Sequence, residues 1–210
     1  MLHWVVLDAM GVVFTVADDT NELLVPFIQE RNPGITREAI NDIYLRASLG
    51  EISSRQLWNE VGLGDRYPDI ETAYLDGGPV VDPEFRPVAM RLARQFRLGL
   101  LSNDVAEWSR YLRARRGLGF DAVTISGDVH CRKPSPDIYR HFLRASGARP
   151  RECVFVDDRT KNLVAAAELG FRTIRFERES PDADDTAGFE PDARIAGFAE
   201  LEEAVTRIGG

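Results

Sequence analysis

The sequence contains little cysteine, with only Cys131 and Cys153 among its 210 residues. Two cysteines do not make the disulfide framework of a small secreted domain, so we expect both thiols to be unpaired in a reducing compartment. The chain also lacks an apolar run of the ~20 residues that a helix needs to cross a bilayer, so no membrane partner is expected. Because the first apolar run already begins at Trp4, there is no room before it for a signal peptide, and we expect a cytoplasmic protein.

Basic charge is scarce as well, since 26 Lys and Arg face 34 Asp and Glu, for a formal net charge of -8. Nucleic-acid binding needs a concentrated positive patch, so no nucleic-acid partner is expected. The one basic cluster, at 110–116, lies on a predicted helix, where we interpret it as a solvated face. The hydrophobic fraction of 44 % is enough for one core plus a small accessory unit.

Short apolar runs alternate with helical patterns along most of the chain. Runs without polar alternation are typical of strands buried on both faces, and helices between them indicate right-handed crossovers. The sequence therefore predicts an α/β fold, a doubly wound, Rossmann-like parallel sheet that is followed by a helix over 199–208. The acidic, turn-rich segment 179–190 is expected to be a mobile surface loop. The predicted strands are 4–7, 98–101, 122–125, 154–156, 173–176 and a brief one at 193–196.

One stretch, residues 18–76, has no strand pattern and shows only helical periodicity. Gly77-Gly78-Pro79 follows it and has the composition of a hinge that returns the chain to the sheet. We therefore expect a helical insertion, residues 17–79, after the first strand. It would lie over the strand ends of a core formed by 1–16 and 80–210.

Polar and charged side chains follow the ends of four predicted strands. In open α/β sheets, reacting groups gather outside the carboxyl ends of the strands, so these residues are expected to meet. An aspartate at a strand tip can attack phosphorus and form an aspartyl-phosphate. Three crowded carboxylates would need a hard cation such as Mg²⁺ to neutralise them. The residues in question are Asp8, Ser102-Asn103, Lys133-Pro134 and Asp157-Asp158 with Asn162 beyond.

In this order and spacing, the polar residues resemble the four motifs of the haloacid dehalogenase (HAD) superfamily of phosphotransfer hydrolases. LDAMGVVF is similar to the first motif, LLSN to the second, RKPSPDIY to the third and VFVDDRTKNLVAAAELG to the fourth. The Asp-Asp-x-x-x-Asn form of the fourth motif is similar to the subfamily that contains the phosphatase domain of epoxide hydrolases. The insertion at 18–76 falls where that subfamily carries a small helical cap. The resemblance thus runs nearly end to end and implies a small phosphorylated metabolite as substrate.

The resemblance implies a magnesium site at the strand ends. Mg²⁺ would bind the carboxylates of Asp8 and Asp158 and the main-chain carbonyl of Met10. Asp157 is a further candidate ligand, at a position that is often glycine in relatives. These are oxygen donors, which suit a hard divalent cation.

Catalytic and substrate-binding roles also follow from the resemblance. Asp8 would be the nucleophile, and Lys133 would bridge it and the phosphoryl oxygens, stabilising charge in the transition state. The hydroxyl of Ser102 and the amide of Asn103 would donate to the same oxygens.

The first motif departs from the family at Met10, where the phosphatases carry a second aspartate. In those enzymes this aspartate protonates the leaving oxygen and then activates the water that clears the phosphoenzyme. A thioether can do neither, and losing acid–base help typically costs ~10²- to 10⁴-fold in rate. Activity is therefore expected to be weak or restricted to particular substrates.

Three functions fit this sequence. The first is a Mg²⁺-dependent phosphatase of an activated or self-assisting substrate, which the retained Lys133 and Asp158 favour. The second is a metal-independent 2-haloacid dehalogenase in which Asp8 attacks carbon; those enzymes also lack the second aspartate but keep no Asp-Asp pair in the fourth motif. The third is a non-catalytic protein that keeps the pocket to bind a phosphorylated ligand or a partner. The sequence leaves open a monomer or a homodimer.

Two other residues are candidates to replace the missing acid. His130 lies three positions before Lys133, and histidine titrates near neutrality. Asp104 follows the predicted phosphate-binding pair. Structural or solvated roles are the preferred interpretation for both. Tyr44 and Trp58 in the insertion could contact a substrate, but their helical spacing favours packing.

Overall fold

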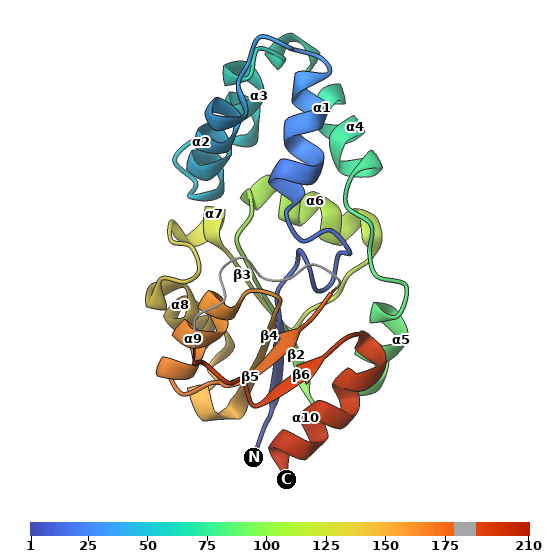
Figure 1. Cartoon of the computed structure of the whole chain (residues 1–210), viewed down its shortest axis with the longest axis vertical. Helices are drawn as coiled ribbons and strands as arrows, with labels where there is room; N and C mark the ends of the chain where they lie inside the picture. Colours follow the sequence, from blue (N-terminus) through green and yellow to red (C-terminus); the bar gives the residue numbers. More distant parts are fainter. Residues whose placement is uncertain (179–187) are drawn as a thin grey trace.

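The computed structural model describes residues 1–178 and 188–210, which form a central parallel sheet covered by helices (Figure 1). The strands lie in the order β3-β2-β1-β4-β5-β6, so the chain winds outward from β1 in both directions. The predicted doubly wound α/β sheet is thereby confirmed. The strands are β1 (Trp4–Leu7), β2 (Arg97–Ser102), β3 (Ala122–Ile125), β4 (Cys153–Asp157), β5 (Arg172–Phe176) and β6 (Ala193–Ile195).

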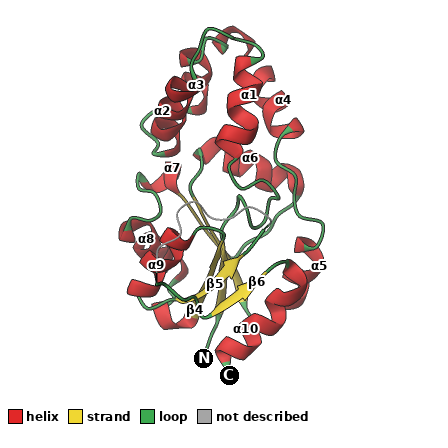
Figure 2. Cartoon of the chain, in the orientation of Figure 1, coloured by secondary structure: helices red, strands yellow, loops and turns green. Residues whose placement is uncertain are grey.

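Strand β1 is buried on both faces, which is why its sequence is apolar throughout. Val5 and Leu7 belong to the hydrophobic cluster on one face of the sheet, and Trp4 and Val6 belong to the cluster on the other. Figure 2 shows the helices on both sides of the sheet. The first cluster includes residues of α5 (Phe85–Leu92), α6 (Ala106–Arg116) and α10 (Leu201–Gly209), and the second includes residues of α8 (Pro136–Ser146) and α9 (Thr160–Glu168).

Between β1 and α5 the chain forms a helical segment, residues 20–77, which lies at one end of the molecule beyond the carboxyl ends of the strands (Figure 1). It packs directly on the core, because the indole Nε1 atoms of Trp58 and Trp108 both donate to Oε2 of Glu71, at 3.0 and 2.8 Å. Its buried side chains and those of one sheet face form one continuous cluster. The helices of this segment are η1 (Thr20–Leu24, a π-helix), α1 (Val25–Gln29), α2 (Arg37–Ser48), α3 (Ser54–Glu60), η2 (Gly64–Arg66) and α4 (Asp69–Gly77).

Smaller features noted in the sequence can also be placed in the structure. Cys131 and Cys153 are free thiols. No helix in the described residues has both the length and the apolar character needed to span a membrane. In the basic cluster of α6, Arg110 and Arg115 are exposed and pair with Asp128 and Asp76. Most of the predicted loop at 179–190 lies outside the described residues, since 179–187 are not described.

Candidate active site

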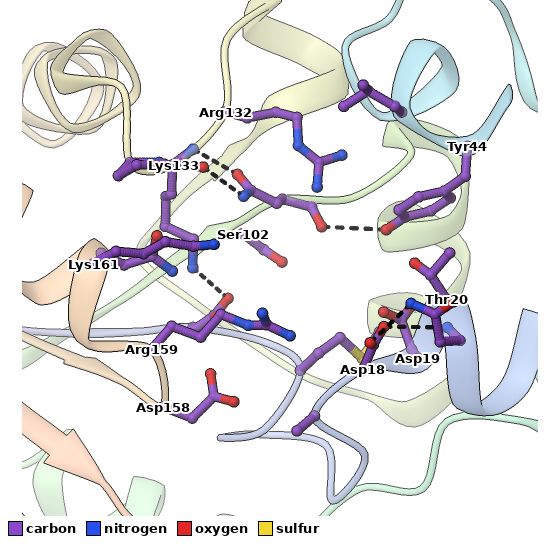
Figure 3. Close-up of a pocket in the computed structure, with 18 of the residues that line it drawn as sticks. Asp18, Asp19, Thr20, Tyr44, Ser102, Arg132, Lys133, Asp158, Arg159 and Lys161 are labelled. Atoms are coloured by element: carbon purple, nitrogen blue, oxygen red, sulfur yellow. Dashed lines mark hydrogen bonds and ion pairs between the residues drawn. The ribbon is translucent and has the colours of Figure 1, made fainter. Parts of the chain in front are cut away.

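A cavity of about 370 Å³ lies where the helical segment meets the carboxyl ends of the strands (Figure 3). The core contributes the predicted site residues to its wall, and the helical segment contributes polar side chains of its own. The sequence placed the core residues at neighbouring strand ends, and the structure brings them together in this one cavity. The predicted site residues that line it are Asp8, Met10, Ser102, Asn103, Lys133, Asp158 and Asn162.

Asp8 follows the last residue of β1 and is 7 % exposed. Its Oδ1 accepts a hydrogen bond from the amide of Ala9 at 2.6 Å and lies 2.7 Å from Nζ of Lys133. Burial raises the pKa of Asp8 to about 7, although the charge of Lys133 opposes that rise. Both donors contact Oδ1 of Asp8, and Asp8 also lines the cavity.

Lys133 lies between two carboxylates. Its Nζ is 2.7 Å from Asp8 Oδ1 and 2.7 Å from Asp157 Oδ2, and both ion pairs are buried. Burial alone would lower the pKa of Lys133, but the two carboxylates raise it above its usual value, so the ammonium remains charged. The structure therefore places a fixed positive charge beside Asp8.

Asp157 is fully buried and its oxygens already accept several donors. Besides Lys133, the amide Nδ2 of Asn162 lies 3.1 and 3.0 Å from the two carboxylate oxygens, and the main-chain amide of Arg159 donates to Oδ1 at 2.8 Å. These contacts suit a carboxylate that orients Lys133. The role of Asp157 as a metal ligand stays a prediction.

The second motif holds the third in place. The amide Nδ2 of Asn103 donates to the main-chain carbonyl of Lys133 at 3.0 Å, and the amide of Lys133 donates back to Asn103 Oδ1 at 2.8 Å. Asn103 thus fixes the backbone that carries Lys133. Ser102 ends β2 and lines the cavity, where its side chain is almost fully buried. Their donation to a phosphoryl group stays a prediction.

Three carboxylates form the acidic cluster that the sequence predicted. Asp8, Asp157 and Asp158 each offer an oxygen within 4.8 Å of the others. Burial, together with Asp157 and Asp8, raises the pKa of Asp158 to about 8. Burial first, and the neighbouring carboxylates second, disfavour the negative charge of Asp8 and Asp158, and a divalent cation with oxygen ligands would offset both effects. The donor set therefore suits a hard divalent cation such as Mg²⁺, and the assignment of Asp8 and Asp158 as its ligands stays a prediction.

Met10 lines the cavity where the second aspartate of the resemblance would stand. Neither His130 nor Asp104, the two candidate replacements for the missing acid, is among the described residues that line the cavity. His130 Nδ1 lies 2.9 Å from the carbonyl of Leu49, and Asp104 Oδ1 accepts from the amide of Val105 at 2.7 Å. The structural interpretation of both residues is therefore supported.

Sequence reasoning missed several residues of the cavity. Asp19 and Arg132 line it, and the guanidinium of Arg132 lies 5.7 Å from the ring centroid of Tyr44, which also lines it. Trp58, by contrast, is fully buried, as the packing interpretation expected. The position of Arg132 beside Lys133 was the available signal for that residue.

A further missed residue, Arg178, lies just after β5. Its Nε donates to the carbonyl of Gly11 at 2.8 Å, and its Nη2 donates to the carbonyl of Val12 at 2.8 Å and to Asp82 Oδ2 at 2.7 Å. Arg178 thus ties the turn after Asp8 to the connection between α4 and α5, which returns the chain from the helical segment. Nothing in its own sequence neighbourhood signals this contact.

Comparison with known proteins decides the family. Residues 5–170 match the haloacid dehalogenase-like hydrolases. The chain belongs to this family. The HAD resemblance expected from the four motifs is thereby confirmed.

Among curated HAD-family relatives, the chain is similar to a glyceraldehyde 3-phosphate phosphatase of Methanopyrus kandleri, with 32 % identity over 136 residues, 60 % of this chain and 57 % of that protein. It is also similar to a phosphoserine phosphatase of Thermus thermophilus, with 34 % identity over 115 residues, 51 % of this chain and 44 % of that protein. The matches thus span about half the length of these relatives.

Solved structures of the HAD family share the fold over nearly the whole chain. A 2-haloacid dehalogenase from Pseudomonas syringae has a TM-score of 0.74 at 21 % identity, covering 99 % of each chain. An HAD phosphatase from Thermococcus onnurineus has a TM-score of 0.72 at 22 % identity, covering 97 % of this chain and 98 % of that one. Phosphatases and dehalogenases therefore share this architecture, and the fold does not choose between them.

Proposed function

We propose that this HAD-family chain is a Mg²⁺-dependent phosphatase that hydrolyses a small phosphorylated metabolite through an aspartyl-phosphate on Asp8. The observation that carries the proposal is the position of Lys133, whose ammonium bridges Asp8 and Asp157 beside the carboxylate of Asp158. An anionic nucleophile such as Asp8 is repelled by a negatively charged phosphoryl group, so positive charge is needed beside both. The ammonium of Lys133 supplies one such charge, and a cation bound by Asp8 and Asp158 would supply another. The names of the two curated relatives above support the same chemistry.

In the proposed reaction, a carboxylate oxygen of Asp8 attacks phosphorus, the bond to the leaving oxygen breaks, and water then hydrolyses the aspartyl-phosphate. Lys133 would stabilise charge on the phosphoryl oxygens and, by opposing the rise in the pKa of Asp8, favour the ionised form of its carboxyl. Ser102 would donate to the same oxygens, and Asn103 would keep Lys133 in position. When bound by Asp8, Asp158 and the carbonyl of Met10, Mg²⁺ would supply charge neutralisation at the phosphoryl group.

Residues 17–79, which include the helical segment, are proposed to form a cap that limits the size of the substrate. The cavity beneath it holds about 370 Å³, room for a small metabolite. Tyr44 and Asn41 of α2 line it from the side of the helical segment. Because Met10 supplies no proton, turnover would be restricted to substrates whose leaving group departs with other help.

The two alternatives make different use of the same residues. A metal-independent 2-haloacid dehalogenase would bind a carboxylate substrate and so add a further negative charge beside the acidic cluster of Asp8, Asp157 and Asp158, with no cation to offset it. A non-catalytic binding protein is favoured by one observation, that position 10 carries a methionine and not a carboxyl group.

The test is a screen of phosphorylated metabolites, including glyceraldehyde 3-phosphate and phosphoserine, with and without Mg²⁺, and with 2-chloropropionate as the dehalogenase control. We expect Mg²⁺-dependent phosphate release that Asp8→Asn abolishes, because an amide cannot act as the nucleophile. Chloride release without metal would establish the dehalogenase. Binding of phosphorylated ligands with no turnover would establish the binding protein.

A further inference from the structure

The proposed chemistry uses neither Asp18 nor Asp19, two carboxyl groups of the cavity wall. Asp18 accepts hydrogen bonds from the main-chain amide and the side-chain amide of Asn21, so Asp19 is the candidate for a further role. It lies on the connection between the turn after Asp8 and η1, and it is 8 % exposed while lining the cavity. Its side chain does not cap the helix that follows. The main-chain amide of Thr20 donates a hydrogen bond to the Asp19 carboxyl group, which lies in the wall of the cavity.

The surroundings of Asp19 favour proton exchange near neutral pH. Burial and the adjacent Asp18 raise the pKa of Asp19 to about 6, and the amide of Thr20 only partly opposes this rise. A group with a pKa near the working pH is an efficient general acid and base. The other charged or titratable groups that face Asp19 are Arg132, Arg159, Asp104, Tyr44 and Tyr74.

The position of Asp19 relative to the nucleophile decides which atom it can serve. Figure 3 shows Asp18, Asp19 and Thr20 on one side of the pocket, with Lys133 and Asp158 on the other. Asp8 belongs to the side of Lys133, because their side chains are 2.7 Å apart. In an in-line displacement the leaving oxygen lies across phosphorus from the attacking oxygen. The leaving oxygen would therefore point toward the wall that carries Asp19.

From this arrangement we infer that Asp19 is the general acid and base of the reaction, supplying the proton transfer that Met10 cannot. This inference rests on the proposed phosphatase function. It also explains the restriction of substrate, because only a leaving group that places its oxygen against the Asp19 wall receives the proton.

The two steps balance. In the first, the Asp8 oxygen bonds to phosphorus, the phosphorus–oxygen ester bond breaks, and the leaving oxygen takes the proton of the Asp19 carboxyl. In the second, the Asp19 carboxylate takes a proton from water as its oxygen bonds to phosphorus. The bond between phosphorus and Asp8 then breaks, which frees phosphate and returns Asp8 as a carboxylate and Asp19 as an acid.

The experiment compares two probes on Asp19→Asn, which is nearly isosteric with the wild type. Glycerol 3-phosphate has a poor leaving group that needs a proton, whereas 4-nitrophenyl phosphate has a good one that does not. We expect kcat/KM to fall about 10²-fold for glycerol 3-phosphate and by less than about threefold for 4-nitrophenyl phosphate. The ratio of the two losses is independent of the fraction of folded enzyme, so partial misfolding does not mimic the result.

Glu22→Gln is the matched control, since it makes the same carboxyl-to-amide change on the exposed side chain of Glu22, which is not among the described residues that line the cavity. It should leave both rates unchanged. Equal losses for both probes in Asp19→Asn, or no loss, would overturn the assignment of Asp19 while leaving the phosphatase function intact. A wild type that hydrolyses only 4-nitrophenyl phosphate would also overturn it. A wild type that hydrolyses no phosphate ester at all would instead refute the proposed function.

Discussion

A Cβ atom on Gly11 would lie 2.4 Å from Oδ2 of Asp158, closer than two such atoms can approach. Gly11 also has a φ of +76°, a conformation that side chains disfavour. The turn after Asp8 is thus built so that the backbone of the first motif passes directly against the carboxylate of the fourth. That contact makes Gly11 part of the geometry of the proposed metal site.

Gly11→Ala is therefore expected to displace Asp158 as well as strain the backbone. We expect Mg²⁺ affinity and kcat both to fall at least tenfold, with a loss of roughly 1–2 kcal/mol in the free energy of unfolding. Gly147→Ala is the control, because Gly147 has a φ of +69° but no atom within 4 Å of its would-be Cβ. It should cost similar stability and leave Mg²⁺ binding unchanged, as measured by calorimetry and urea unfolding.

Mg²⁺ binding should depend on pH, because the ion competes with protons for the carboxyl groups of Asp8 and Asp158. Without metal, the pKa of Asp8 is raised to about 7 and that of Asp158 to about 8, both above the ordinary aspartate pKa of 3.8. The folded state then binds more protons than the unfolded state between about pH 4 and pH 8, so these two groups destabilise the metal-free fold progressively as pH rises through that window. A cation that binds the ionised carboxylates offsets this loss of stability, and it does so most near pH 8, where the loss is largest.

We accordingly expect Mg²⁺ to raise the melting temperature more at about pH 8 than at about pH 6, in thermal unfolding scans with and without the ion. Asp158→Asn should lose most of this pH-dependent increment, since it removes one of the two carboxyls. An increment that is the same at both pH values in the wild type would argue that the cation binds elsewhere.

Asp157 and Asp158 are neighbours in sequence with different expected roles. Asp157 accepts from Lys133 and Asn162, so Asp157→Asn should loosen Lys133 and lower kcat about 10-fold or more while Mg²⁺ affinity changes only a few-fold. Asp158→Asn should weaken Mg²⁺ binding at least tenfold. Titration of both variants with Mg²⁺ separates the roles, and a large loss of affinity in Asp157→Asn would show that Asp157 is a ligand.

The strand ends were predictable because two local signals coincide there. The apolar run before Asp8 or Asp157 predicts a buried strand, and the polar residue after the run marks the carboxyl end of that strand. Because the strands are parallel, these ends meet at the same edge of the sheet. The order of the residues then supplied the family. What the sequence could not give was how the side chains divide the work, for example that Asn103 binds the main chain of Lys133.

Residues that enter the site from distant segments escaped prediction for a physical reason. Asp19 lies in an acidic pair ahead of a helix, where carboxylates commonly act as caps, so nothing local distinguishes a cavity carboxyl. Arg178 contacts Gly11 across 167 positions of the chain. Such contacts depend on how the helical segment and β5 pack against the first turn, which periodicity does not encode.

Arg178 should matter for both stability and rate. Arg178→Met removes three hydrogen bonds and leaves Asp82, which is 7 % exposed, without its ionic partner. We expect a loss of about 1–3 kcal/mol in the free energy of unfolding, together with a lower kcat, because the turn that carries Gly11 loosens. Arg172→Met, which breaks an exposed pair with Asp192, is the control and should cost less than about 1 kcal/mol. Urea unfolding and rate assays of both variants check this.

Met10→Asp tests whether an aspartate at position 10 and Asp19 can perform the same proton transfer. If Asp19 already serves as the acid, Met10→Asp should raise kcat/KM for glycerol 3-phosphate less than about tenfold in the wild type. In the Asp19→Asn background, where the acid is missing, the same change should restore about 10²-fold. Such strong non-additivity is expected only when two groups perform one task. Equal gains in both backgrounds would mean that the groups act independently and that the loss in Asp19→Asn has another cause. A dehalogenase would gain nothing from the added charge in either background, so the four rates also separate the proposed phosphatase from that alternative.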